Sequence, residues 1–174
     1  MALSALSIEE VNSLISEHFI KIFGNVVEHC PAAAIGILKY RPFHSTVDIC
    51  KAIVNYLDGL NINEKENILR SHQDFVAQLA HLSTLQLERR VKKRDRAISL
   101  EALTVSDKRR LNLLNNKYKE KFGFPFIIFG KRNIDHIFNE MEKRMENCSE
   151  TEIIVALQEV KKISRVRIHE IIRR

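Results

Sequence analysis

Glycine and proline are scarce in this chain of 174 residues, which contains five glycines and three prolines. A turn-rich β fold needs many such residues, so their scarcity argues against one. Long stretches consist instead of leucine, isoleucine, alanine, glutamate, lysine and arginine, which form helices readily. The sequence therefore predicts an all-α fold, a single compact multi-helix domain over residues 1–174, with 45% hydrophobic residues to fill its core.

Cysteine is also rare, and Cys30, Cys50 and Cys148 lie far apart in the sequence. An odd number of separated cysteines suggests neither a disulfide framework nor a zinc site, and favours a reducing compartment. The first residues lack the basic start and the continuous apolar stretch of a signal peptide. No run approaches the roughly 18 apolar residues of a membrane span. We therefore expect no metal ion and no membrane partner.

Positive charge is in modest excess, with a formal net charge of +6. It is concentrated in residues 89–96, where six of eight residues are lysine or arginine. This basic run has no interleaved aromatic residues and matches no nucleic-acid-binding motif, so we interpret it as a solvated helix face and predict no nucleic-acid partner. The excess charge itself is compatible with an anionic small molecule or with solubility alone.

Local signals predict where several helices begin and end. Ser7 and Glu10 form a capping-box pattern, Pro31 suits the first position of an apolar helix, and Gly59 suits a helix end. Farther along, we expect a turn over residues 61–63 followed by a short helix over residues 64–70.

Two more helix starts are predicted in the second half of the chain. Ser106 is placed to cap a helix, and Ser149 with Glu152 repeats the capping-box pattern before a final helix. Between these helices, residues 122–130 are dense in aromatics and bounded by glycines, and Pro125 forbids a regular helix there. We predict one short, extended, buried aromatic segment.

Arg167 lies at helical spacing among apolar residues of the final helix. It is seven residues from Val160 and four from both Ile163 and Ile171, whereas Arg165 falls on the polar face. An inward arginine is costly unless it meets an anion. Two interpretations stay open: an ion pair with an Asp or Glu of the chain or a snorkelling side chain, and an anchor for a carboxylate ligand.

His72 stands in a polar break, Ser71 to Asp74, between two helical patterns. A histidine titrates near neutral pH and can transfer a proton as a general acid or base. Most loop histidines have no such role, so position alone makes His72 a candidate and no more. The other histidines show no spacing that suggests a metal ligand.

Three parts of the chain together resemble the 2-oxo-4-hydroxy-4-carboxy-5-ureidoimidazoline (OHCU) decarboxylase family. They are residues 23–31 with Arg41-Pro42-Phe43, residues 68–74, and residues 115–126 with residues 159–168. The strings Phe-Gly-Phe-Pro-Phe at 122–126 and Glu-Val-Lys-Lys-Ile at 159–163 are specific in combination. The order and spacing resemble the family along nearly the whole chain.

The resemblance implies an all-helical domain that forms a homodimer and uses no cofactor. It implies a carbon–carbon lyase that decarboxylates a small anionic ureidoimidazoline, OHCU, to (S)-allantoin in urate degradation, a part of purine metabolism. By the same resemblance His72 is the catalytic acid/base and Arg167 contacts the substrate. The segment that meets the substrate through backbone groups corresponds to Phe126, Ile127, Ile128, Phe129 and Gly130.

The chain also departs from the family pattern. Gln73 replaces the proline that follows the histidine, and an ungapped alignment places Arg89 and Lys92 where the family has a serine and a catalytic glutamate. A cation at position 92 would lower the pKa of His72 and remove its hydrogen-bond acceptor, so the glutamate's role is not transferred. The alternative is a degenerate member that binds a ligand or partner without turnover.

The cellular compartment implied by the resemblance is the cytoplasm or the peroxisome. The chain ends in Ile172-Arg173-Arg174 and not in a tripeptide of the Ser-Lys-Leu type, so that peroxisomal signal is not predicted.

Overall fold

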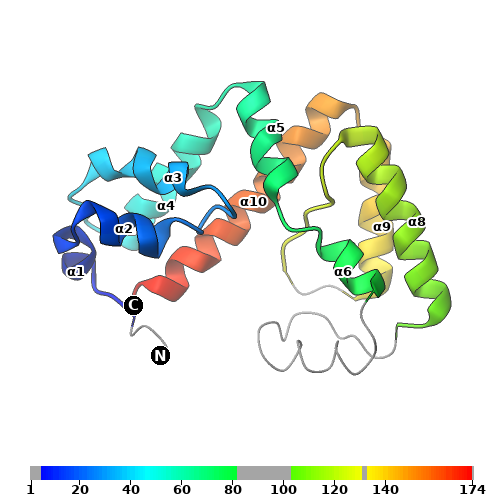
Figure 1. Cartoon of the computed structure of the whole chain (residues 1–174), viewed down its shortest axis with the longest axis horizontal. Coiled ribbons are helices and arrows are strands. Elements are labelled where there is room, and N and C mark those ends of the chain that lie inside the picture. Colours follow the sequence, from blue (N-terminus) through cyan, green and yellow to red (C-terminus); the bar gives the residue numbers. More distant parts are fainter. Residues whose placement is uncertain (1–4, 82–102, 131–132, 174) are drawn as a thin grey trace. The chain divides into compact units, whose positions relative to one another are not determined.

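The computed structural model describes residues 5–81, 103–130 and 133–173, and most of these residues are helical (Figure 1). The elements in chain order are α1 (Ile8–Ser13), α2 (Ser16–Phe23), α3 (Pro31–Ile37), the 3-10 helix η1 (Leu38–Tyr40), α4 (Thr46–Asp58), α5 (Ile62–Ser71), α6 (Phe75–His81), α8 (Val105–Phe122), α9 (Ile134–Met145) and α10 (Ser149–Ile171). No strand occurs in these described ranges, so the predicted all-α class is confirmed. None of the helices described is long and apolar enough to cross a membrane.

The chain divides by its internal contacts into two units. One comprises Met1–Ser71 with Leu157–Arg174, and the other comprises His72–Ala156. Helix α10 therefore contributes its first residues to the second unit and the rest to the first. The basic run at 89–96, with Arg89 and Lys92, lies outside the described residues.

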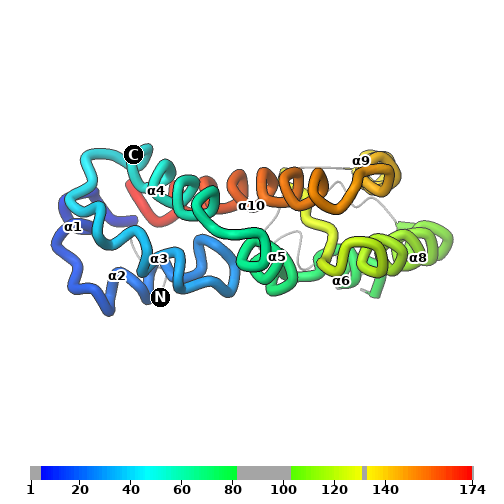
Figure 2. The backbone as a smooth tube through the Cα atoms, turned by 90° about the horizontal axis from the view of Figure 1, so that it is seen from above, coloured from blue at the N-terminus to red at the C-terminus, as the bar shows by residue number. Residues whose placement is uncertain are grey.

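The first unit is built around the apolar helix α3, which packs against α2 and α4 (Figure 2). Pro31 is its first residue, as predicted, and Ala33, Ala34 and Ile37 are buried. The apolar stretch after Pro31 thus forms part of the core of this unit.

The two ends of the chain meet in the same unit. Leu6 and Ile172 form an isolated bridge, in which the N–H of Leu6 donates to the carbonyl of Ile171 at 2.8 Å.

Capping chemistry fixes the helix ends of the first unit. Ser7 and Glu10 exchange hydrogen bonds of 2.7 and 3.1 Å, which confirms the predicted capping box. Gly59 caps the end of α4 as expected. The predicted turn over residues 61–63 is wrong, because Asn61 and Glu64 exchange hydrogen bonds of 2.9 and 3.0 Å and the helix already begins at Ile62.

Two predicted caps in the second half are corrected by the structure. Helix α8 begins at Val105, because Thr104 forms a capping box with Asp107, and Ser106 lies inside the helix. Helix α10 already includes Ser149. The Glu152 carboxylate is fully buried and accepts from the side chains of Arg144, Tyr118 and Asn147.

The second unit has α8 packed against both α6 and α9 (Figures 1 and 2). Gly123 ends α8 with a φ of +78°, a conformation that glycine adopts without strain. The chain then leaves helical structure, and Phe124, Phe126 and Ile127 are buried. The predicted non-helical aromatic segment is therefore confirmed from Gly123 on, but the predicted start at Phe122 is wrong, because that residue still belongs to α8.

Candidate functional site

His72 lies in the short connection between α5 and α6 and is half-buried. Asp74, two residues later, caps α6: its Oδ1 accepts a hydrogen bond of 2.9 Å from the Ala77 N–H. The first N–H groups of a helix have no acceptor within the helix, and the Asp74 carboxylate supplies one for α6.

Asp74 also ties this connection to α8. Its carboxylate accepts from Asn115 Nδ2 at 3.0 Å and from Lys119 Nζ at 2.7 Å. Burial alone would raise the pKa of the Asp74 carboxyl, but its hydrogen bonds outweigh burial and lower that pKa below its ordinary value. Asp74, two residues after His72, is therefore ionised and fixes this connection to α6 and α8.

The substitution Asp74→Asn is expected to lower the free energy of unfolding by about 1 kcal/mol near pH 7. Asparagine still caps α6, so the loss reports the charge toward Lys119. A carboxyl with a lowered pKa stabilises the fold above its unfolded pKa of 3.8, and that stabilisation disappears as pH falls through the folded pKa. Urea unfolding of both proteins near pH 7 and near pH 2.5 tests this, and an equal difference at both pH values contradicts it.

The aromatic segment packs onto Tyr118 of α8. The rings of Phe124 and Phe126 meet the Tyr118 ring edge-on, with centroids 6.0 and 5.2 Å apart. Such edge-to-face contacts add to the apolar area that each ring buries. Ile128 and Phe129 are half-buried and Gly130 is exposed, so the segment emerges from the core as it proceeds.

A buried polar cluster lies beneath this segment and was not anticipated from the sequence. Arg144 of α9 is 3% exposed and Glu152 of α10 is 0% exposed. Arg144 Nε donates to Glu152 Oε1 at 2.6 Å, and the Tyr118 hydroxyl donates to the same oxygen at 2.5 Å. Asn147 Nδ2 donates to Glu152 Oε2 at 2.9 Å.

Helical spacing was the signal that could have identified Arg144. It lies three residues after Met141 and seven after Ile137, both of which are fully buried. The same spacing argument that selects Arg167 therefore also places Arg144 on an apolar face.

Burial raises the pKa of the Tyr118 hydroxyl in this cluster well above its ordinary value. Glu152 raises that pKa further, whereas Arg144 lowers it. Tyr118 therefore stays protonated and donates.

Arg167 belongs to the first unit, where two groups of one loop hold it. Its Nη1 donates to the carbonyl of Asn25 at 3.0 Å, and its Nη2 lies 3.3 Å from Glu28 Oε2. The loop is shaped by His29, whose φ of +53° is unusual for a residue other than glycine, and whose N–H donates to Asn25 Oδ1 at 3.0 Å.

The structure thus supplies the carboxylate that one interpretation of Arg167 requires. The Glu28 side chain is 9% exposed and that of Arg167 is 30% exposed, while Arg165 is on the exposed face as predicted. His72 and residues 126–130 belong to the second unit, whereas Arg167 belongs to the first.

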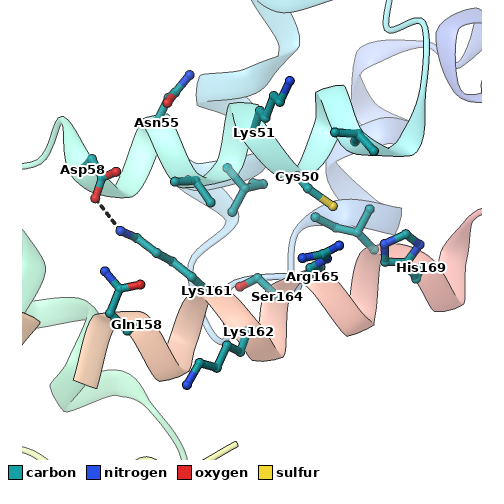
Figure 3. A pocket seen from close by; sticks show the side chains of 14 residues that line it. Cys50, Lys51, Asn55, Asp58, Gln158, Lys161, Lys162, Ser164, Arg165 and His169 are labelled. Atoms are coloured by element: carbon teal, nitrogen blue, oxygen red, sulfur yellow. Dashed lines mark hydrogen bonds and ion pairs between the residues drawn. The ribbon is translucent and has the colours of Figure 1, made fainter. Parts of the chain in front are cut away.

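A groove of about 610 Å³ lies between α4 and α10 of the first unit (Figure 3). Cys50, Ser164 and Arg165 line it, and Lys161 closes one side through a 2.5 Å ion pair with Asp58. Burial raises the pKa of the Cys50 thiol, which keeps it protonated and a poor nucleophile. None of the predicted site residues lines this groove.

No three His, Cys, Asp or Glu side chains within the described ranges are grouped so that they could hold a metal ion. The absence of a cofactor remains a prediction.

Comparison with known proteins gives a consistent result along the chain. A family model described as OHCU decarboxylase matches residues 12–169, which includes parts of both units. An Amia calva protein named 2-oxo-4-hydroxy-4-carboxy-5-ureidoimidazoline decarboxylase is 36% identical and covers 96% of this chain and 95% of its own length. A Xenopus laevis protein of the same name is 32% identical and covers 94% and 93%.

A solved structure described as (S)-allantoin synthase matches with a TM-score of 0.77 at 20% identity. The match covers 96% of this chain, which spans only 54% of the solved chain, and it supports the fold alone. Because the family match covers most of the sequence and the relatives align over nearly their whole length, this chain belongs to the OHCU decarboxylase family.

Proposed function

We propose that this chain, acting as one domain, decarboxylates OHCU to (S)-allantoin in urate degradation without a cofactor. The observation that carries this proposal is the match to proteins named for that activity over 94–96% of the chain. His72, residues 126–130 and Arg167 all fall within the matched residues 12–169.

The reaction needs two kinds of group from the protein. Loss of carbon dioxide leaves carbanion character, which must be delocalised and then protonated on one face to give a single enantiomer. A half-buried histidine on a short, fixed connection suits the proton transfer, because it changes protonation state near neutral pH. We assign this step to His72.

The proposed role of Arg167 is to hold an anionic oxygen of the substrate. A guanidinium has five N–H donors, and the bonds to Asn25 and Glu28 use two of them. These two partners orient the side chain before a ligand arrives, which lowers the entropy cost of binding. The ion pair with Glu28 and the role in substrate binding are therefore compatible.

Residues 126–130 complete the proposal as a source of backbone hydrogen bonds. The side chains of Phe126 and Ile127 anchor the segment, since both are buried, while Ile128 and Phe129 are half-buried and Gly130 is exposed. Backbone donors on a non-helical segment are not consumed by a helical ladder and can bind a polar ring.

The substitution Arg167→Ala is expected to raise KM for OHCU roughly tenfold or more, because a charge-assisted hydrogen bond to the substrate is lost. Arg165→Ala, two residues away on the exposed face of the same helix, is the matched control and should leave KM within about twofold. Steady-state kinetics of both variants provide the measurement. Equal effects of the two substitutions would remove Arg167 from the binding site.

The proposed activity itself is tested by the initial rate of carbon dioxide release from freshly generated OHCU. The chain should accelerate release well above the rate in buffer, and no acceleration would overturn the proposal.

The proposal also includes a homodimer and a cytoplasmic or peroxisomal location. Light scattering tests the oligomeric state, and microscopy tests the location.

A further inference from the structure

Arg144 contacts the aromatic segment directly as well as the buried cluster. Its Nη1 donates to the backbone carbonyl of Ile127 at 2.7 Å, and its guanidinium carbon lies 4.4 Å from the centre of the Phe126 ring. One buried side chain therefore holds both a backbone oxygen and a ring of residues 126–130.

The bond to Ile127 has a consequence for the next residue. A trans peptide is planar, and its carbonyl and the following N–H point in opposite directions. Because the Ile127 carbonyl is directed at Arg144, the N–H of Ile128 is directed away from Arg144. The orientation of Arg144 thus decides which way this backbone donor faces.

Arg144 is itself held rigidly. Arg144 Nε donates a hydrogen bond to Glu152 Oε1 at 2.6 Å, and Arg144 Nη2 donates to the Tyr118 hydroxyl at 3.3 Å. Tyr118, Arg144 and Glu152 come from α8, α9 and α10 in turn, so the packing of these three helices sets the geometry of the three side chains.

We propose that Arg144, fixed by Glu152 and Tyr118, is a positioning residue that sets the backbone orientation of residues 126–130 for substrate binding. This inference rests on the proposed function, in which that segment meets OHCU through its backbone. A buried ion pair adds little to stability compared with apolar side chains of similar size. A role in fixing backbone geometry explains its presence beneath this segment.

The test removes the cluster without leaving a buried charge. The triple variant Tyr118→Phe/Arg144→Met/Glu152→Leu replaces it with apolar groups of similar volume. The matched control is Arg110→Met/Glu142→Leu, which removes the exposed 2.5 Å ion pair between α8 and α9 of the same unit. We expect the triple variant to raise KM for OHCU by roughly tenfold or more, because a substrate hydrogen bond is misplaced. The control should change KM by less than about twofold.

Two further readouts separate positioning from general loss of structure. The pH dependence of kcat, which follows the proton-transfer group, should be unchanged in the triple variant. The amide NMR signals of residues 126–130, Ile128 above all, should shift in the triple variant and stay in place in the control. If the triple variant does not fold, Arg144→Lys is used, since lysine keeps the charge opposite Glu152 but lacks the planar fork that reaches Ile127.

The outcomes are distinct. A folded variant with unchanged KM, or with unchanged amide signals for residues 126–130, overturns the positioning role. If the unmodified chain does not accelerate decarboxylation, the proposed function fails, and the amide signals alone then decide whether Arg144 sets the orientation of the segment.

Discussion

The substitution His72→Gln is expected to lower kcat for OHCU by on the order of a hundredfold or more. Glutamine has similar length and can form hydrogen bonds, but it does not transfer a proton near neutral pH. Binding through Arg167 and residues 126–130 is left in place, so KM should change far less than kcat. Stopped-flow or steady-state kinetics with freshly generated substrate measure both constants.

The matched control for this prediction is His81→Gln. His81 ends α6 in the same unit and is exposed, so its replacement should leave kcat within about twofold. If His72→Gln and His81→Gln have the same kcat as the unmodified chain, His72 is not the proton-transfer group.

The largest expected effect on stability comes from Arg144→Ala, which should lower the free energy of unfolding by about 3–5 kcal/mol. The substitution leaves the Glu152 carboxylate in the core without its cation, and Glu152 is 0% exposed. The Ile127 carbonyl also loses its donor. Urea unfolding followed by circular dichroism measures the difference.

Arg110→Ala is the control, because Arg110 pairs with Glu142 where both side chains are 50% exposed. Its loss should cost no more than about 1 kcal/mol, including its contact with the Phe138 ring. If Arg144→Ala lowers the free energy of unfolding no more than Arg110→Ala does, the prediction is contradicted, and the buried pair contributes no more to stability than the exposed one.

Helix starts were predictable where the capping groups are local. Ser7 and Glu10 lie three residues apart and meet each other in the folded chain, as their spacing indicates. Ser149 and Glu152 have the same spacing, yet Glu152 bonds with Arg144 and Tyr118. A tertiary contact overrides a local signal here, and nothing in the spacing distinguishes the two cases.

The candidate site shows the same limit. Periodicity along the last helix indicated that Arg167 needs an anionic partner, and the structure provides Glu28. That partner lies 139 residues away in the sequence, so helical spacing could not identify it. Pro125 and the flanking glycines were sufficient to predict a non-helical segment, which begins at Gly123, one residue later than expected, because Phe122 is the last residue of α8. The arginine that holds the Ile127 carbonyl comes from another element and could not be predicted from this stretch.

The product's handedness tests the central claim most directly. Buffer can protonate either face of the decarboxylated intermediate, whereas a protein-held acid protonates one. Circular dichroism of the reaction of freshly generated OHCU with the unmodified chain should show a growing signal of (S)-allantoin, formed faster than allantoin appears in buffer. A product with no excess of the (S) enantiomer, formed at the buffer rate, would contradict the assignment of this chain as an OHCU decarboxylase.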